Sequence, residues 1–207
     1  MLARLLRRFD PDASTAPTQR VAPADEGTRR QQAEYCELQN NPRYDGMGQA
    51  ERAWALLRDG HWVPPMDRLE AAEHEAGLVR GRHYTEWSDD VARLKRGQQY
   101  DEALRLLHEI IVATEAQQDV ENSNAPARAQ YFGDPITEHV ARETAPGWTN
   151  EAAIIHRKLK NYESEIAVID RWEARAGDQR RWVGATHTKL LERRDKAREL
   201  LAKSRAN

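Results

Sequence analysis

Apolar residues recur through much of the chain at the three- and four-residue intervals of an amphipathic helix. Trp87, Val91 and Leu94 form one such stripe, which predicts a short helix with Thr85 as its N-terminal cap. After a tight turn, a second stripe predicts a helix over residues 101–117. Its expected inner positions are Ala103, Leu104, Leu107, Ile110 and Ile111. The two helices are therefore expected to pack as an antiparallel hairpin.

The same pattern recurs when Tyr100 is aligned with Tyr162, an offset of 62 residues. Thr149 is placed to cap a third helix, and residues 163–176 predict the helix that follows it. The expected inner positions are Trp148, Ala152, Ile155 and Leu159 in the first of these helices, and Ile166, Ile169 and Trp172 in the second. The aligned pairs are Val91 with Ala153, Lys95 with Arg157, Leu104 with Ile166 and Leu107 with Ile169. We interpret this correspondence as an internal repeat.

The first 80 residues carry weaker patterns. Residues 1–30 mix Pro, Ala, Thr, Asp and Gly without apolar periodicity, which predicts a flexible tail. Within it, the apolar side of residues 1–9 indicates either a frayed end or a helix that docks on a membrane surface or a partner. Residues 31–80 predict short helices that pack onto the next unit as a cap. Their expected bounds are residues 31–39, 48–58 and 65–76.

A polar segment over residues 118–147 separates the two hairpins. A connection of this length is unusual in a compact domain, so the segment is either partly helical, near residues 137–142, or functional. After the second hairpin, residues 186–203 predict a last helix with one polar face, which suits the end of a helical stack. We therefore expect an all-α fold with a helical domain over residues 81–203.

The turn of the first hairpin carries a recognisable motif. Residues 94–107 read LKRGQQYDEALRLL and resemble the tetratricopeptide repeat (TPR), and residues 161–166 are a weaker copy with Glu165 in place of a small Ala. Residues 81–97 and 148–160 are similar to the divergent TPR region of many actinobacterial and phage proteins. The resemblance implies antiparallel hairpins stacked in a short right-handed solenoid that binds a protein or peptide.

The chain departs from the TPR pattern in two ways. Its repeats are separated by 62 residues, the offset between Tyr100 and Tyr162, instead of about 34. It also has two hairpins where at least three are usual. Either the flanking helices supply the missing part of the stack, or a second copy of the chain does so in an oligomer.

Composition favours a thin stack over a large core, because 39% of residues are apolar and 32% are charged. The formal net charge of −2 gives no strong overall field for nucleic acid. No apolar run approaches the roughly 18 residues that span a bilayer. Cys36 is the single cysteine, so neither an internal disulfide nor a cysteine zinc site is expected. These features predict a cytoplasmic location.

Signatures of catalysis are missing from the sequence. It has no Gly-rich phosphate loop, no G-x-S-x-G elbow and no H-E-x-x-H motif. Its seven histidines include no pair at i, i+4, and His108 and His156 are expected to be packed or rim residues. We therefore predict no catalytic, cofactor or metal site, and no enzyme activity.

Basic residues near the ends of the two first helices form the candidate partner-binding site. They are Arg93, Lys95, Arg96, Arg157, Lys158 and Lys160. In TPR-like stacks such helices line the concave face, so these groups are expected to hold an acidic peptide or a C-terminal carboxylate. The alternative is that they are solvated charges that favour the negative ends of helices.

A nucleic-acid-associated role is the alternative function. Residues 178–207 carry nine basic and four acidic groups, which would let a C-terminal helix contact phosphates. The acidic body of the chain opposes this interpretation. So do Glu192, Asp195 and Glu199, which are spaced to pair with the basic residues of the same helix.

Overall fold

The computed structural model describes residues 25–140, 144–175 and 185–206, and these residues are almost entirely helical. The α-helices are α1 (Glu26–Gln39), α2 (Gln49–Arg58), α3 (Pro65–Ala76), α4 (Ser88–Arg96), α5 (Tyr100–Phe132), α6 (Pro146–Lys158), α7 (Tyr162–Arg175) and α8 (Ala185–Ala206). The short elements are the 3₁₀ turns η1 (Pro42–Tyr44), η2 (Tyr84–Trp87) and η3 (Ile136–Glu138), and the strands β1 (Leu78–Val79) and β2 (Arg82–His83). The expected all-α fold class is confirmed.

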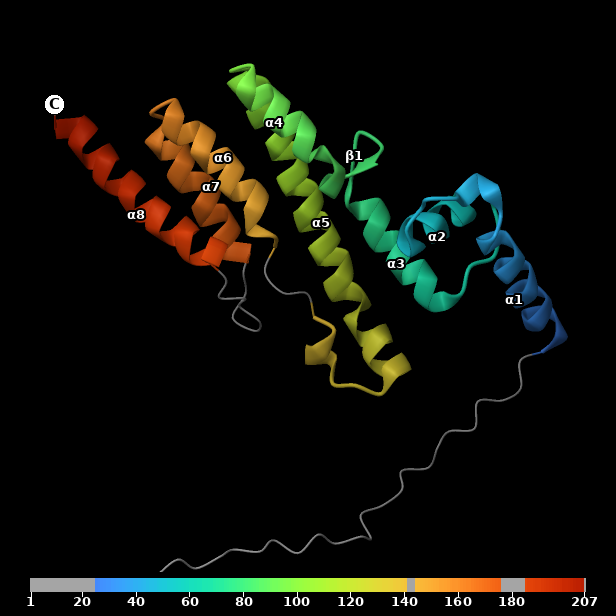
Figure 1. The fold of residues 1–207 in the computed structure, drawn as a ribbon. Helices are drawn as coiled ribbons and strands as arrows, with labels where there is room; N and C mark the ends of the chain where they lie inside the picture. The colour runs from blue at the N-terminus through green and yellow to red at the C-terminus, as the bar shows by residue number, and fades with distance from the viewer. Residues whose placement is uncertain (1–24, 141–143, 176–184, 207) are drawn as a thin grey trace, which may run out of the picture.

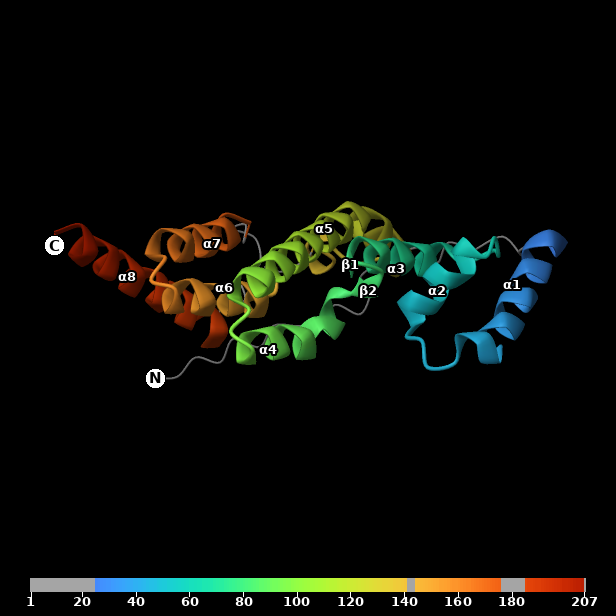
Figure 2. The ribbon, with the colours of Figure 1, turned by 90° about the horizontal axis from the view of Figure 1, so that it is seen from above.

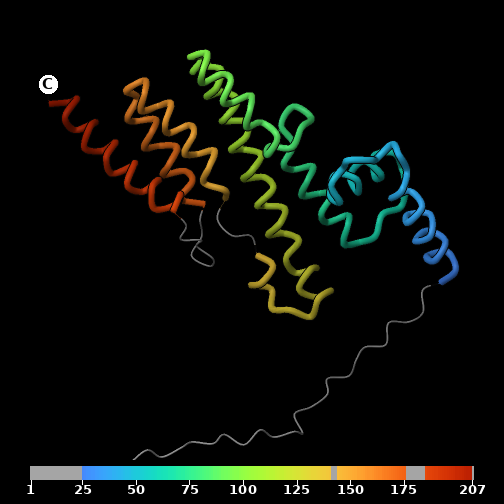
Figure 3. The backbone as a smooth tube through the Cα atoms, viewed as in Figure 1, coloured from blue at the N-terminus to red at the C-terminus, as the bar shows by residue number. Residues whose placement is uncertain are grey.

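The helices follow one another in a row, with α1 at one end and α8 at the other (Figure 1). From above, α4 and α6 lie on one side of the row, and α5 and α7 lie on the other (Figure 2). The path of the backbone shows that the α4–α5 and α6–α7 turns lie at the same edge (Figure 3). No helix in the described ranges is long and apolar enough to cross a membrane.

The first helix begins earlier than predicted. Asp25 caps α1 by accepting a 2.7 Å hydrogen bond from the backbone N–H of Thr28, so the helix starts at Glu26 instead of residue 31. The predicted boundary of the tail at residue 30 therefore falls inside α1. Residues 1–24, with most of that tail, lie outside the described residues.

Helices α1 to α3 share a small core of their own. It consists of Tyr35, Tyr44, Ala53, Leu56, Val63 and Ala71. The Tyr35 hydroxyl donates to Asp67, and the Tyr44 hydroxyl donates to Asp59 over 2.7 Å, so buried aromatic rings keep their polar ends satisfied. At Gly77, where α3 meets α5, an added Cβ would lie 2.6 Å from the end of the Gln117 side chain and 2.6 Å from the His83 ring. A larger residue here would therefore require both side chains to move.

The predicted stripe of the first hairpin is confirmed, but its cap is not. Trp87, Val91 and Leu94 are buried against α5 as expected. The prediction that Thr85 caps the helix is wrong, because a 3₁₀ turn precedes α4 and the His83 and Glu86 side chains form its capping box. The core between α4, α5 and α6 also contains Val79, Ala103, Leu106, Leu107, Ile110, Ile111, Ala113, Ala152 and Ile155.

Helix α5 is 33 residues long and ends at Phe132, not near residue 117. Its extension occupies half of the predicted polar connection, because polar side chains there pack against α3. Asn124 donates to Glu73 over 2.8 Å, and Arg128 pairs with the same carboxylate at 2.8 Å. The helix ends at Gly133, whose φ of +76° suits glycine. Of the predicted helical stretch 137–142, residues 137 and 138 belong to η3, residues 139 and 140 form a turn and a bend, and residues 141 and 142 lie outside the described residues.

The second hairpin and α8 form the third core. Its buried members are Ala153, Ile169, Trp172 and Leu190. The predicted cap at Thr149 is wrong, since α6 begins at Pro146 and Thr149 is buried within the helix. Leu159 was expected on the inner face but is 45% exposed. The last helix begins at Ala185, within one residue of its predicted start.

Positions related by the 62-residue offset have the same backbone geometry in the two hairpin turns. Gln98 and Lys160 both adopt a φ of +57°. The N–H of Gln99 donates to the Leu94 carbonyl over 3.0 Å, and the N–H of Asn161 donates to the His156 carbonyl over 2.9 Å. The two turns are therefore built alike.

Candidate functional site

The α4–α5 and α6–α7 turns lie at one edge of the row (Figure 1). The six predicted cations belong to the helix ends and the turn at this edge. Arg93, Lys95 and Arg96 belong to the last turns of α4. Arg157 and Lys158 end α6, and Lys160 follows in the turn. The two groups come from separate hairpins, as the sequence alignment predicted, but they differ in what they contact.

Lys95 and Arg157, which are aligned in the repeat, each contact the helix two places further along the chain: Lys95 of α4 contacts α6, and Arg157 of α6 contacts α8. The Lys95 amine pairs with the carboxylate of Glu151 in α6. The Arg157 guanidinium lies 2.5 Å from Glu165 and also donates to the Arg193 carbonyl of α8 over 2.9 Å. Both cations therefore join neighbouring helices.

Glu165 stands at the position that Ala103 occupies in the first hairpin, and both side chains are fully buried. A buried carboxylate requires a cationic partner. Arg157 provides it, and Arg193 lies 3.7 Å away. The buried carboxylate at the position aligned with Ala103 is thus accommodated by two arginines, one from α6 and one from α8.

Three of the six cations lack a carboxylate partner in the described ranges. Arg96 and Lys160 are exposed, and the Lys158 amine lies 5.0 Å from the centroid of the Tyr100 ring. Arg93 instead pairs with Asp90 at 3.0 Å. The free cations are therefore Arg96, Lys158 and Lys160, which we call the edge cations.

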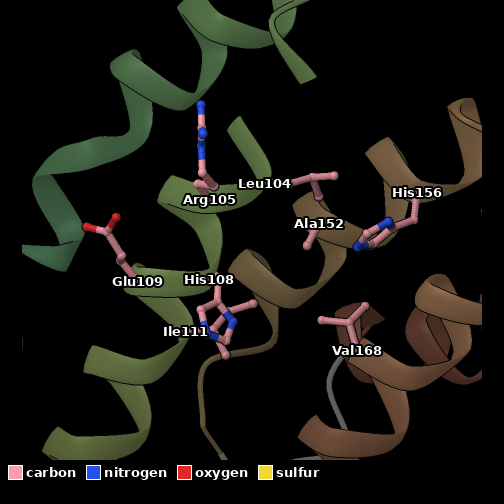
Figure 4. A pocket seen from close by; sticks show the side chains of 8 residues that line it. All are labelled: Leu104, Arg105, His108, Glu109, Ile111, Ala152, His156 and Val168. Carbon is pink, nitrogen blue, oxygen red and sulfur yellow. The ribbon is translucent and has the colours of Figure 1, made fainter. Parts of the chain in front are cut away.

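A groove of about 440 Å³ opens between α5, α6 and α7, and we call it the α5–α6 groove (Figure 4). It is lined by Leu104, Arg105, His108, Glu109 and Ile111 from α5, Ala152 and His156 from α6, and Val168 from α7. The two histidines come from opposite walls (Figure 4). The groove thus combines an apolar floor with nitrogen-bearing side chains.

The polar groups of this groove differ in their electrostatic state. Burial lowers the pKa of His156, and its Nδ1 atom is buried without a hydrogen-bond partner in the part of the chain that the structure describes. Arg80 holds Glu109 through hydrogen bonds of 2.8 and 2.6 Å, which lower the pKa of that carboxyl. Arg105 is exposed and has no ion pair there.

Sequence reasoning missed this groove, because His108 and His156 are 48 positions apart and share no motif. Two signals were present nonetheless. Leu104, His108 and Ile111 follow each other at i, i+4 and i+7, which places them on one face of α5. His156 also replaces a core residue, since the aligned position of the first hairpin is the buried Leu94.

A second groove, of about 360 Å³, lies between α4 and α6. It is lined by Ser88, Val91, Ala92, Lys95, Gly147, Trp148 and Glu151. Lys95 and Glu151 of this lining form an ion pair with each other. Within the described residues, no group of three or more His, Cys, Asp or Glu side chains could hold a metal ion. Cys36 is exposed.

Most basic side chains of α8 are engaged in ion pairs. Arg193 approaches Glu165, Arg194 pairs with Asp170 and Glu173, Lys196 with Glu199, Arg198 with Asp170 and Asp195, and Arg205 with Glu163. The positive charge of the helix is therefore largely compensated by the acidic residues of α7 and of α8 itself. Arg180 and Arg181 lie outside the described residues.

No protein-family model matches the chain, and no curated protein or solved structure matches it either.

Proposed function

We propose that this chain is an interaction module that binds an acidic segment of a protein partner through the edge of its helical row. In this proposal the hairpins α4–α5 and α6–α7 form a short right-handed TPR-like solenoid, with α8 as its cap. The equal turn geometry of the two hairpins supports a repeating unit. The aligned residues Lys95 and Arg157 also support it, because Lys95 of α4 contacts α6 and Arg157 of α6 contacts α8.

The observation that carries the proposal is that Arg96, Lys158 and Lys160 belong to the two turns at one edge and have no carboxylate partner among the described residues. Most other basic side chains of α4 to α8 are already paired within the chain. A partner's carboxylates could therefore bind the edge cations without first breaking an internal ion pair. Arg96 adds the planar donor geometry that suits carboxylates.

The binding role is favoured over the nucleic-acid alternative by the ion pairs of α8. Phosphate contacts by Arg194 or Arg198 would have to replace their contacts with Asp170. The proposal is of a binding role without catalysis, in the cytoplasm, with no cofactor.

The test is affinity capture of a partner from the native host, followed by binding of the purified partner to charge-reversal variants. The double variant Arg96→Glu, Lys158→Glu replaces attraction by repulsion at the edge, so its affinity should fall about tenfold or more. The matched control is Lys189→Glu, Lys203→Glu, which changes the net charge equally on exposed positions of α8. Equal affinities of the two double variants would contradict the proposal, provided circular dichroism shows unchanged helicity.

A further inference from the structure

We propose that the α5–α6 groove takes a large apolar side chain from the bound segment, while Arg105 and Lys158 hold carboxylates next to it. The preferred ligand is then a peptide in which an aromatic or large aliphatic residue is flanked by acidic residues. This inference deepens the proposed function and rests on it only in requiring a peptide partner. It concerns a different face of the molecule from the α4–α6 groove.

The floor of the groove fits an apolar side chain. Leu104 and Ile111 form one wall, Ala152 lies opposite, and Val168 closes the side formed by α7 (Figure 4). The volume of about 440 Å³ lies within the range of roughly 300–1,000 Å³ that is typical of ligand pockets. Ile111 and Ala152 are already buried, whereas Leu104 and Val168 are partly exposed. A bound side chain would remove these two from water together with its own surface, which is the main favourable term in such contacts.

The charge at the rim selects an acidic neighbour for that side chain. Glu109 is the acidic residue of the lining, and its charge is neutralised by the two hydrogen bonds from Arg80. Arg105 is left as an exposed cation, with His108 one turn further along α5. The rim is therefore complementary to a carboxylate.

His156 provides a further argument. The aligned position in the first hairpin is Leu94, which is buried in the core and needs no polar partner. In the second hairpin the imidazole Nδ1 is buried and unsatisfied in the described part of the chain. Because water does not reach this atom, a peptide backbone group could bond it only after the imidazole turned toward the groove, and that bond would satisfy it.

The groove is also continuous with the edge cations. Tyr100 lies one turn before Leu104 on the same face of α5, and the Lys158 amine rests over its ring. The Tyr100 hydroxyl is a second buried atom without a partner among the described residues. A segment seated in the groove would thus reach Lys158 at its upper end.

The test uses the full chain and a short fluorescein-labelled peptide with a central Trp between glutamates. Two companion peptides replace the Trp by Ala or the glutamates by Gln. Fluorescence anisotropy should show that each replacement weakens binding, by about tenfold or more for the Trp because a large apolar side chain is no longer buried. If the first peptide does not bind, or if all three bind equally, the proposal is wrong.

Variants then locate the site. Val168→Trp fills the groove from α7 and should weaken the Trp peptide by about tenfold or more. The control Val112→Trp makes the same change on α5 at an exposed position that does not line the groove, and should leave binding unchanged. Arg105→Ala should weaken binding about two- to fivefold, the range of an exposed ion pair. Equal effects of the two Trp variants would overturn the assignment.

A measurement on the unaltered chain tests the proposal even if Val168→Trp does not fold. The imidazole NMR signals of His108 and His156 should shift when the Trp peptide is added, and unshifted signals would overturn the proposal. The two proposals also fail differently. The edge is tested apart from the groove by Arg96→Glu, Lys160→Glu, which leaves Lys158 in place. If the natural partner tolerates this variant but not Val168→Trp, the edge proposal fails and the groove stands; the opposite result removes the groove.

Discussion

Glu165 in α7 and Arg157 in α6 form an ion pair in which the carboxylate is fully buried and lies 2.5 Å from the guanidinium Nε. Arg157 also donates to the Arg193 carbonyl, so this one side chain of α6 contacts both α7 and α8. Glu165 stands where the first hairpin has Ala103. The second hairpin therefore depends on Arg157 and on its contacts with α8 to hold a buried charge.

Removal of the cation alone should therefore destabilise the second hairpin. Arg157→Met leaves the Glu165 carboxylate buried, with Arg193 3.7 Å away as a remaining partial partner. We expect a loss of about 2–4 kcal/mol in the free energy of unfolding, somewhat below the 3–5 kcal/mol typical of a fully unpaired buried charge. Urea unfolding followed by circular dichroism measures it.

The double variant Arg157→Met, Glu165→Ala supplies the control. It restores the alanine of the aligned position Ala103 and removes the unpaired charge, so it should be more stable than Arg157→Met. A double variant that is less stable than the single one would show that the ion pair is not the reason for the loss.

Local signals allowed much of the fold to be predicted. The stop at Gly77 and the turns before Tyr100 and Tyr162 depend on residues next to them in sequence, and the corresponding helices lie close to their expected bounds. The extension of α5 could not be predicted in this way. Its polar residues gain their contacts from Glu73, more than 50 positions away.

In the candidate site, too, the features set by neighbouring residues in sequence could be predicted, and those set by helix packing could not. Five of the six cations lie in the last turns of α4 and α6, where the negative end of the helix dipole favours them, and Lys160 lies in the turn that follows. The sequence could not show that Lys95 and Arg157 are held by Glu151 and Glu165, because carboxylate partners depend on how helices pack. The α5–α6 groove was missed for the same reason.

The extension of α5 should depend on its contact with α3. Arg128→Ala deprives the nearly buried Glu73 of its ion pair, leaving the hydrogen bond from Asn124. The expected loss is about 1–3 kcal/mol of local stability. Hydrogen exchange should become faster over residues 118–132 while residues 101–113 stay protected. The control Arg105→Ala, at an exposed position of the same helix, should leave both stretches unchanged.

Stability should fall as the pH rises through the range in which Glu121 titrates. Burial raises the pKa of Glu121 above its ordinary value of 4.5, and the charge of Glu73 adds to the rise. Between 4.5 and the raised value, the folded chain keeps a proton that the unfolded chain has lost, so folding weakens as the pH increases.

Glu121→Gln should abolish this contribution. The variant should be more stable than the parent at pH 7, and the difference should shrink as the pH falls from the raised pKa towards the ordinary value of 4.5. Urea unfolding across the acidic and neutral range measures both. Glu192→Gln, at an exposed position of α8, should give no such pH-dependent difference. A constant gap between Glu121→Gln and the parent would refute the assignment to this carboxyl.

The equivalence of the two hairpin turns can be tested through their left-handed residues. Gln98 and Lys160 both have a φ of +57°, which is strained for residues with a side chain. Glycine relieves that strain but loses more entropy on folding, so Gln98→Gly and Lys160→Gly should each stabilise the chain by about 0.5–1 kcal/mol. Because the backbone geometry is the same, the two gains should agree. As a control, Ala92→Gly inside α4 should destabilise by about 1 kcal/mol. Thermal unfolding that shows opposite signs at the two turns would mean that the hairpins are not built alike.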